Sequence, residues 1–210
     1  MLRFLTQTWH RNILEDLLKK HADMFSGKIL DVGSERRRYD AYFHAAVDAV
    51  DIHPDAENNI VFGDIERGLD IPDATYDGIV CTEVVEYLTN YEAAFMEISR
   101  LLKPESYAII SIPFMYPDHK DNIRFTDQFA KKMISKYFSE VSFTPMGNKW
   151  TVIWDACRLA FLRSWGRYLG FGKYVVLFPC VLLYVGSVKL FGLHKQVDEF
   201  YSGQFIVVKK

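Results

Sequence analysis

Four residues in the first third of the chain have the types and spacing expected at a nucleoside-binding site. Gly33 ends the apolar run "KILDVG", Asp31 lies within that run, and Asp51 and Asp64 close the next two apolar runs. Glycine permits a tight turn beside a ligand, and a carboxylate at a strand end accepts hydrogen bonds from ribose hydroxyls. Asp51 follows Gly33 by 18 residues, which suits the ribose role, and Asp64 can accept from an exocyclic amino group such as that of adenine. Asp31 could fix the glycine loop or receive an ammonium group.

The residues after Gly33 read "SERRR", which limits the kind of ligand that the loop can bind. A dinucleotide needs the further glycines of GxGxxG so that its pyrophosphate can approach the backbone, and they are missing here. A nucleoside without phosphates needs less of this contact. Arg36 and the two arginines after it have two interpretations: a solvated loop before a helix, or a site for an anionic acceptor such as a phosphate or uronate group. Each strand-end acid has an alternative role as a turn or N-cap residue.

The segment "PFMYPDHKDNIRFTDQF" (113–129) carries the side chains that could act on an acceptor molecule. His119 is the natural general base for a hydroxyl group, because its unperturbed pKa lies near neutrality. Asp118 or Asp121 could orient this histidine. Arg124 could bind a carboxylate or phosphate of the acceptor, or it could pair with Asp121. The alternative is that His119 is an ordinary loop histidine.

These residues must be positioned by a parallel sheet, because short apolar runs alternate with helical patterns along the chain. In such a sheet, ligands bind beyond the carboxyl ends of the strands. "YEAAFMEISRLL" has one apolar helical face and is stopped by Lys103-Pro104, and "FTDQFAKKMISKYF" predicts a helix capped by Thr126. The fold class predicted is a doubly wound, Rossmann-like, mostly parallel seven-stranded α/β sheet. Its strands are expected at 28–33, 46–52, 60–65, 76–84, 106–113, 141–147 and 204–210.

The chain has an ordinary globular composition with an uneven distribution of charge. Half of its 210 residues are apolar, a quarter are charged, and the net charge of −2 gives no indication of nucleic-acid binding. Between Asn148 and Gln196, however, seven Lys and Arg accompany a single acid, Asp155, so this segment carries +6 and the remainder −8. We therefore expect the segment to face an anionic surface.

The cysteines and the N-terminal segment indicate a cytoplasmic protein. Cys81, Cys157 and Cys180 are widely spaced and lack the spacing of metal ligands, so we expect reduced, buried thiols and no metal site. Residues 1–27 lack the apolar core and cleavage site of a signal peptide. Their apolar residues recur at helical spacing and predict one amphipathic helix. We expect it to pack against the main domain, with a lipid or partner contact as the alternative.

Residues 148–203 interrupt the predicted domain before its last strand and carry three of the four tryptophans. The stretch "YVVLFPCVLLYVGSV" (174–188) is uncharged over 15 residues. A helix of that length spans about 22 Å, short of a hydrocarbon layer of about 30 Å, and Pro179 would kink it. Arginines beside aromatic residues upstream suit an anionic headgroup region. We expect a monotopic or re-entrant membrane contact, with a buried insert or a homodimer interface as alternatives.

Several of these runs together resemble a known family. "ILDVG", "VDI", "GDI", "YDGIVCTEVVEYL" and "EISRLLKPESYAIISIP" occur over residues 28–147 in the order typical of class I S-adenosylmethionine-dependent methyltransferases. The most specific part, "CTEVVEYL…YEAAFMEISRLLKP", is similar to the family's EVLEH…EI.RVLKPGG pattern. The resemblance implies S-adenosylmethionine as the cofactor. It assigns Asp31 and Gly33 to the cofactor loop, Asp51 with Ile52 to the ribose, Asp64 with Ile65 to adenine, and Thr82 with Glu83 to the methionine end.

Two positions depart from the family's pattern. Glu35 stands where a second glycine is common, and Glu105-Ser106 replace the two glycines after Lys103-Pro104. The first change removes a residue that allows close approach of the cofactor, so we expect weaker cofactor binding. The second concerns a turn far from the chemistry.

The sequence thus predicts an S-adenosylmethionine-dependent methyltransferase. The run from His119 to Thr126 resembles methyltransferases of polysaccharide gene clusters, in which a histidine precedes Asp-x-x-Arg-Tyr/Phe-Thr. This implies transfer to an oxygen of a sugar or lipid-linked glycan, on the cytoplasmic face of the membrane. His119 and Asp121 are then the catalytic residues, and Arg124 and Arg36 bind the acceptor. The alternative is a catalytically decayed protein of the same shape that binds a partner or the membrane.

Four segments follow from these patterns. They are an N-terminal helix (1–27), a cofactor-binding core (28–147), a hydrophobic and basic helical insert (148–203) and a final strand of the core (204–210).

Overall fold

The computed structural model describes residues 3–117, 119–196 and 199–210, which form two compact units. The sheet unit comprises residues 15–113, 120–144 and 204–210, and the helical unit comprises residues 1–14, 114–119 and 145–203. Two of the segments expected from the sequence, 1–27 and 28–147, are therefore each divided between the units. The two units are built on different principles, and each is described by itself.

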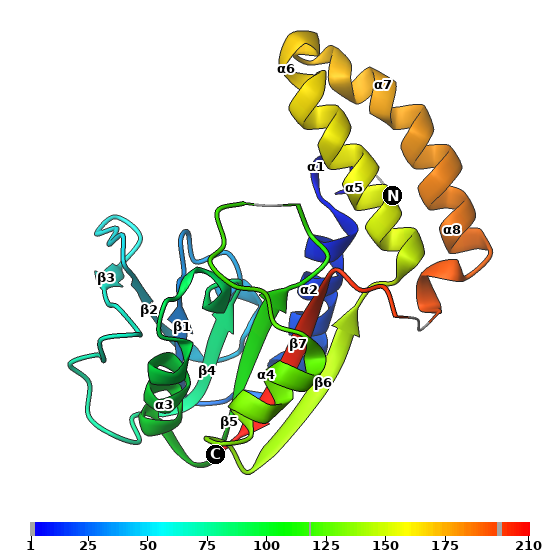
Figure 1. The fold of residues 1–210 in the computed structure, drawn as a ribbon. Coiled ribbons are helices and arrows are strands. Elements are labelled where there is room, and N and C mark those ends of the chain that lie inside the picture. The colour runs from blue at the N-terminus through cyan, green and yellow to red at the C-terminus, as the bar shows by residue number, and fades with distance from the viewer. Residues whose placement is uncertain (1–2, 118, 197–198) are drawn as a thin grey trace. The chain divides into compact units, whose positions relative to one another are not determined.

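The sheet unit contains one seven-stranded sheet with the order β3-β2-β1-β4-β5-β7-β6 (Figure 1). The first five strands pair in parallel, as their near-continuous apolar runs predict. β7 is antiparallel to β6, because the amide of Ser139 donates to the carbonyl of Lys209 at one end, and that of Ser202 donates to Met146 at the other. The predicted mostly parallel α/β fold is confirmed. Its strands are β1 Lys28–Val32, β2 Ala46–Asp51, β3 Ile60–Phe62, β4 Tyr76–Thr82, β5 Leu102–Pro113, β6 Glu140–Met146 and β7 Gly203–Lys209.

Two strands differ most in length from their predicted ranges. β3 ends at Phe62, so Asp64 lies two residues beyond the strand rather than at its end. β5 begins at Leu102, because the chain is already extended through Lys103-Pro104 and pairs with β4 across a bulge. Within this bulge Glu105 has φ 63°, the left-handed backbone region that glycine occupies most readily. Glu105, which replaces a glycine of the family's pattern, thus keeps a glycine-like backbone conformation.

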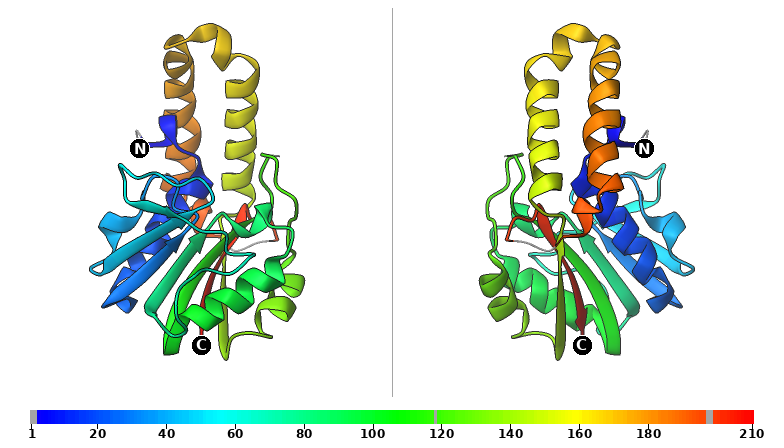
Figure 2. Two further views of the ribbon diagram at one scale, coloured as in Figure 1. Left: turned by 90° about the vertical axis from the view of Figure 1, so that its left-hand side faces the viewer. Right: turned by 90° about the vertical axis from the view of Figure 1, so that its right-hand side faces the viewer.

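Two helices cover one face of the sheet and share its main core (Figure 2). α3 (Tyr91–Leu101) ends directly before the extended Lys103-Pro104, as predicted. α4 (Asp127–Ile134) begins after Thr126, whose Oγ1 accepts from the amide of Phe129 at 3.4 Å, and the predicted N-cap is confirmed. The buried apolar side chains of these helices in the core are Ala94, Phe95, Ile98, Leu101, Ala130, Met133 and Ile134.

The N-terminal segment forms two helices rather than the single one predicted. α1 (Arg3–Thr6) and α2 (Trp9–His21) are separated at Thr8, whose Oγ1 accepts from the amide of Arg11 at 3.2 Å. A threonine that caps a new helix competes with continuation of the preceding one. The chain up to Leu14 belongs to the helical unit, and the rest of α2 belongs to the sheet unit. The expectation that the segment packs as one helix against the main domain is therefore corrected.

Two buried charged residues of α5 (Lys149–Ser164) hold the N-terminal segment in the helical unit. The two carboxylate oxygens of Asp155 accept from successive backbone amides at the start of α2, at 2.7 and 2.9 Å. The guanidinium of Arg158 donates to the carbonyl oxygens of Phe4, at 3.2 Å, and Leu5, at 2.8 Å. A carboxylate at a helix N-terminus satisfies donors that have no partner within the helix. The insert and the N-terminal residues therefore form one unit.

The insert is a helical hairpin (Figures 1 and 2). α5 is its first arm, and α6 (Gly166–Leu169) lies in the turn. The second arm runs from Gly172 to Leu190 as α7 (Gly172–Cys180), a π-helical turn (Val181–Val185) and α8 (Gly186–Leu190). The rings of Trp154 and Tyr184 stack between the arms with centroids 5.4 Å apart. These contacts give the hairpin a narrow core of its own.

The second arm is longer than the uncharged stretch on which the sequence argument relied. The helical run spans 19 residues, about 28 Å, and has a mean hydropathy of 1.6 in its most apolar window. Among the described residues it is the one helix long and apolar enough to cross a membrane. Pro179 lies inside it and lacks the backbone donor of a helical residue, and a π-helical turn begins two residues later.

The cysteines are distributed differently from the prediction. Cys81 is buried in β4, but Cys157 and Cys180 are exposed on the hairpin. The expectation of three buried thiols is therefore wrong for two of them. The physical reason is that a two-helix hairpin has only one buried seam, so most of its positions face outward.

Candidate cofactor site

The loop after β1 passes close to the loop after β4 at the carboxyl edge of the sheet. Gly33 has φ 71°, and its amide donates to the carbonyl of Val50 at 2.8 Å. A Cβ atom at this position would collide with the side chain of Val84. Gly33 is thus required both by its backbone conformation and by the close approach of the second loop.

Glu35 keeps the backbone geometry that the missing second glycine would have. Its φ is 50°, and its amide donates to Oδ2 of Asp51 at 3.1 Å. Arg37 has φ 52° and binds the loop to the rest of the unit through Asp40, at 2.7 Å, and the carbonyl of Val47, at 2.7 Å. The loop therefore keeps its tight turn without further glycines, at the cost of two strained non-glycine residues.

Asp51 ends β2 and stands at the centre of this edge. Its Oδ1 accepts from the amide of His53 at 2.8 Å, and its Oδ2 accepts from Glu35, as described above. The side chain remains 13 % exposed. Because a carboxylate has about four lone-pair sites, these two bonds leave acceptor capacity for ribose hydroxyls. Ile52, the next residue, is 58 % exposed and offers an apolar surface beside that carboxylate.

Asp64 and Ile65 lie in the turn after β3. Asp64 accepts from the amide of Glu66 at 3.0 Å and pairs with Arg67 at 3.1 Å, and its side chain is 20 % exposed. Ile65 is buried in the main core. Asp64 is therefore a partly buried turn acid beyond the strand, and Ile65 anchors that turn to the sheet.

Thr82 and Glu83 follow β4, next to the end of β1. Thr82 is nearly buried, and Glu83 has φ 57°. The amide of Glu83 donates to the carbonyl and to Oγ of Ser111, both at 3.1 Å, and the hydroxyl of Ser111 donates back to Oε1 of Glu83 at 2.8 Å. β5 thus fixes the loop that the resemblance assigns to the methionine end.

Glu86 is a candidate residue that the sequence reasoning missed, although it lies in the quoted run "EVVEYL". It is fully buried, three residues after Glu83. Burial, followed by the neighbouring Glu83 carboxylate, raises the pKa of Glu86 to about 9, so its carboxyl group is neutral near pH 7. A neutral carboxyl group can donate a hydrogen bond at this edge. The spacing of the two glutamates on a turn after a strand was the signal that could have identified it.

Asp31 lies in β1 between Ala49 of β2 and Val80 of β4. Burial raises the pKa of Asp31 to about 7, and the carboxylates of Asp40 and Asp51 act in the same direction. Asp31 and Asp51 therefore lie near enough to interact, at the edge where β1 and β2 end. A buried carboxylate of this kind gains from an ammonium partner, which is one of the two roles considered for it.

The predicted acceptor residues are divided between the units. Asp121 and Arg124 lie in the sheet unit, where both carboxylate oxygens of Asp121 bind the guanidinium of Arg124. This is the pairing that stood as the alternative to acceptor binding. His119 lies in the helical unit, where its Nδ1 is 3.2 Å from the carbonyl oxygen of Pro117. Asp118, the other residue considered as its partner, lies outside the described residues.

The loop after β5 is tied to the loop after β4. The carbonyl oxygen of Glu86 accepts from the amides of Asn122, at 2.7 Å, and Ile123, at 3.1 Å. Asp121 and Arg124 are therefore held beside the predicted methionine end. Arg36 is exposed in the loop after β1, which consists of turns and a short 3₁₀ helix (Asp40–Tyr42) rather than the helix expected there.

Comparison with known proteins agrees with this architecture. Residues 30–110 match the family described as "Methyltransferase domain". A search of the curated proteins finds none that matches the chain. An S-adenosylmethionine-dependent methyltransferase from Archaeoglobus fulgidus is 17 % identical, with a TM-score of 0.62 over 95 % of this chain and 94 % of that one.

Two further solved structures show the breadth of the fold. Phosphoethanolamine N-methyltransferase 2 of Haemonchus contortus, solved with S-adenosylmethionine, is 15 % identical with a TM-score of 0.59. The match covers 95 % of this chain, which spans about half (52 %) of the Haemonchus protein. The [4+2]-cyclase SpnF is 12 % identical with a TM-score of 0.57, over 94 % of this chain and 79 % of that one. The shared fold thus supports more than one chemistry.

Residues 30–110 therefore match a methyltransferase domain, and the fold is the Rossmann-like one of the S-adenosylmethionine-dependent methyltransferases compared above. S-adenosylmethionine is the cofactor of that class, and the edge described above fits it. Asp51 and exposed Ile52 suit a ribose and its attached adenine, Gly33 gives close access to the backbone, and Asp31 suits an ammonium group. When bound, this cofactor supplies a methyl group on a positively charged sulfur.

The raised pKa of Asp31 predicts a pH dependence of cofactor binding. If this carboxylate receives the cofactor's ammonium group, affinity rises with pH as Asp31 ionises through about pH 7. Binding of S-adenosylhomocysteine, measured by calorimetry, should be roughly tenfold weaker one unit below that pKa than at full ionisation. The Asp31→Asn variant should bind weakly and without this pH dependence.

Stability provides the control for this prediction. The pKa of Asp31 is higher in the folded state than its ordinary value of 3.8, so the folded protein loses stability as pH rises from about 4 to 7. Asp31→Asn should lack this loss and be at least as stable as the wild type at neutral pH. An unchanged binding profile in the variant would remove Asp31 from the cofactor site.

Proposed function

We propose that this protein transfers a methyl group from S-adenosylmethionine to an oxygen of a sugar, on a glycan that is linked to a membrane lipid. The observation that carries the methyl-transfer part is the polar edge formed by Gly33, Asp51 and Asp31 in a methyltransferase domain. The acceptor is inferred from the resemblance of the His119 segment and from the surface of the helical unit.

The transfer requires in-line attack by the acceptor oxygen. A lone pair of the hydroxyl oxygen forms the new C–O bond to the methyl carbon while the C–S bond breaks. The electron pair of the C–S bond returns to sulfur, which leaves S-adenosylhomocysteine. The hydroxyl proton passes to a base, and we assign this role to His119. Asp121 positions Arg124, whose guanidinium contacts an anionic part of the acceptor, and Arg36 is a second candidate for that contact.

The surface of the helical unit supports a membrane-held acceptor. Only 22 % of the apolar window in the second arm of the hairpin is buried. Apolar side chains along this arm and around the turn at its end are exposed, among them Trp165 (66 %), Tyr168 (81 %), Phe171 (82 %) and Leu183 (73 %). An apolar surface of this kind is unusual on a soluble monomer and marks contact with lipid or a partner.

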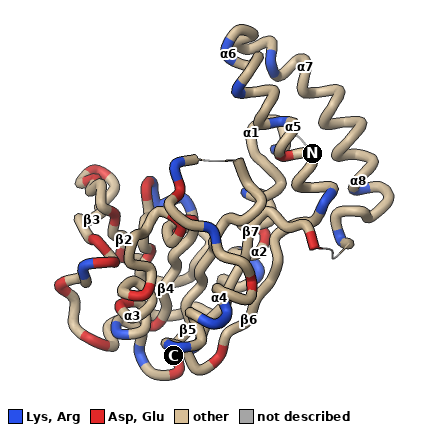
Figure 3. Tube along the Cα trace, in the orientation of Figure 1, with Lys and Arg blue, Asp and Glu red and all other residues tan. Residues whose placement is uncertain are grey.

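The charge of the same unit favours an anionic lipid surface. Figure 3 shows Lys and Arg distributed over α5 to α8, with Asp155 as the one acid of that segment. Basic residues beside exposed aromatic residues are typical of the headgroup region. We propose a peripheral, monotopic contact with the cytoplasmic face of the membrane. Because both units belong to one chain, this contact raises the effective concentration of membrane-held acceptors for the methyltransferase domain.

A second candidate is a binding protein without catalysis. The strained Glu35 and Arg37 in the cofactor loop favour it, because a loop with fewer glycines is a feature of a decayed site. In this alternative the exposed face of the hairpin binds a partner or a second copy of the chain. Cofactor binding distinguishes the two functions.

The first prediction concerns Asp51. Asp51→Ala should weaken binding of S-adenosylmethionine by about 10- to 100-fold, because hydrogen bonds to a charged acceptor contribute roughly 1.5–3 kcal/mol. Calorimetric titration measures the change. Asp55→Ala is the matched control, since Asp55 makes similar bonds to following amides, at 3.0 and 3.3 Å, but lies in the turn beyond β2. Absence of saturable wild-type binding at millimolar cofactor would favour the non-catalytic alternative.

The second prediction concerns transfer itself. With radiolabelled S-adenosylmethionine and a membrane lipid extract, the wild type should transfer label into the organic phase, and mild acid should release it with the glycan. His119→Ala should keep cofactor affinity and lower the transfer rate by about 10²- to 10⁴-fold, as loss of a general base does. Label in the aqueous phase only would overturn the lipid-linked acceptor, and full activity of His119→Ala would exclude this base.

The third prediction concerns the membrane. The wild type should float with vesicles that contain phosphatidylglycerol, and the triple variant Trp165→Ser, Tyr168→Ser, Phe171→Ser should lose most of this binding because it buries less apolar area. Met96→Ser with Phe62→Ser is the control, since both side chains are similarly exposed, 58 % and 64 %, in the sheet unit. Equal flotation of the triple variant and the wild type would contradict the monotopic contact.

A further inference from the structure

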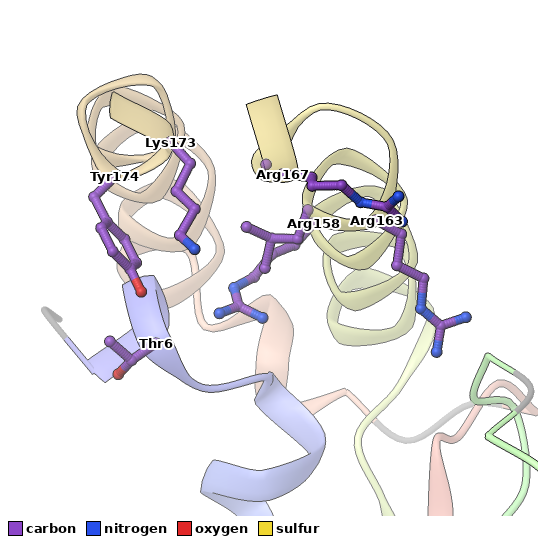
Figure 4. Close-up of a pocket in the computed structure, with 8 residues that line it drawn as sticks. Thr6, Arg158, Arg163, Arg167, Lys173 and Tyr174 are labelled. Carbon is purple, nitrogen blue, oxygen red and sulfur yellow. The ribbon is translucent and has the colours of Figure 1, made fainter. Parts of the chain in front are cut away.

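The helical unit contains a cavity of about 550 Å³ near the turn of the hairpin (Figure 4). α5, the turn and α7 line it from the insert, and Thr6 of α1 lines it from the N-terminal segment. Cationic side chains dominate its lining, and Tyr174 and Thr6 add two hydroxyl groups. The cations are Arg158, Arg163, Arg167 and Lys173.

Two of these cations converge on the cavity, and its lining contains no acid: Figure 4 shows the charged groups of Arg158 and Lys173 directed into it, and those of Arg163 and Arg167 directed away from it. Among the described residues, the eight that line it include no Asp or Glu. Like charges around one cavity repel each other, and the repulsion is strongest where water is excluded. An anion bound between the cations would replace this repulsion with attraction. The arrangement is therefore that of an anion site rather than of a packing defect.

Arg158 gives the cavity a rigid, buried donor. Its side chain is 5 % exposed, and two of its five N–H groups are held by the carbonyl oxygens of Phe4 and Leu5. Burial lowers its pKa, the cost of placing a cation away from water. Asp155, the acid nearest to it in sequence, binds two amides at the start of α2. Figure 4 shows the Arg158 guanidinium and the Lys173 ammonium pointing into the space between α5 and α7.

The chemistry of the lining selects the type of anion. Guanidinium groups bind the oxygens of a phosphate in pairs, and an ammonium group adds a point charge. The hydroxyl group of Tyr174 can donate to a further oxygen, whereas that of Thr6 donates to the carbonyl of Arg3 at 3.3 Å. A guanidinium, an ammonium and a phenol hydroxyl that face one space suit a phosphate group, and a terminal phosphate or pyrophosphate with more than one negative charge gains most from the two cations.

The surroundings select the source of that group. Arg167 and Lys173 alternate in sequence with the exposed Trp165, Tyr168 and Phe171, the side chains proposed above to enter the headgroup region. If those side chains enter the headgroup region, a phosphate in this cavity is one that a lipid carries. We propose that this cavity binds the phosphate or pyrophosphate group of a membrane lipid, and that a polyprenyl-type carrier, with its terminal charge, fits better than a diester phospholipid.

This assignment goes beyond the proposed methyl transfer but rests on the proposed membrane contact, and its test compares two lipid headgroups without any measurement of methyl transfer. The probe is a set of phosphatidylcholine vesicles that contain either a polyprenyl pyrophosphate or enough phosphatidylglycerol to match its charge. The wild type should bind the pyrophosphate vesicles about tenfold more tightly, a difference of about 1.4 kcal/mol. The double variant Arg167→Gln, Lys173→Gln should lose this preference.

Lys149→Gln with Lys195→Gln is the matched control, because it removes the same charge from the helical unit outside the cavity and should keep the preference. All four tryptophans lie in this unit, so their fluorescence reports whether each variant is folded. Inorganic pyrophosphate should compete with the vesicles for the cavity. If it competes but the wild type does not prefer the pyrophosphate vesicles, the lipid source is overturned. Equal binding of the wild type to both vesicle types, or equal loss in both double variants, would overturn the site.

Discussion

The close approach of two loops at the carboxyl edge of the sheet is the constraint on which the cofactor site depends. The loop after β1 can pass the loop after β4 only because Gly33 has no side chain to meet Val84. Asp51 then holds the next turn of the same loop through the amide of Glu35. The residue proposed to bind the ribose thus also shapes the loop beside the ribose, so binding and local structure share one carboxylate.

The helical unit depends on a different kind of contact. Asp155 and Arg158 are buried charges, and each is satisfied by backbone groups of the N-terminal segment. A buried charge is tolerated when hydrogen bonds replace its hydration, and removal of its partners is costly. The first residues of the chain are therefore part of the hairpin. Because the Arg158 guanidinium is held by these backbone carbonyls, it has a fixed position in the wall of the cationic cavity.

The departures from the family's glycine pattern have a common explanation. Glu35 and Glu105 stand where glycines are usual, and both adopt positive φ. The turns are imposed by the hydrogen bonds and strand pairing around them, so a non-glycine residue adopts a strained conformation instead of changing the loop. Sequence analysis treated the first substitution as the loss of a residue that allows close approach of the cofactor. The structure shows that the shape is kept and that the cost is local strain.

The sequence by itself determined the strands, the order of helix and strand, the cap at Thr126 and the acids near the carboxyl edge, because these follow from periodicity and local chemistry. Glu86 is also present in the sequence, but it becomes a candidate site residue only because it is buried, and no local sequence pattern shows that burial. Only the tertiary structure decided that Arg124 pairs with Asp121, that the chain up to Leu14 belongs to the helical unit, and that four cationic residues of that unit line one cavity. These features join residues far apart in the chain or depend on which side chains fill a shared space, and such contacts are set by packing rather than by sequence spacing.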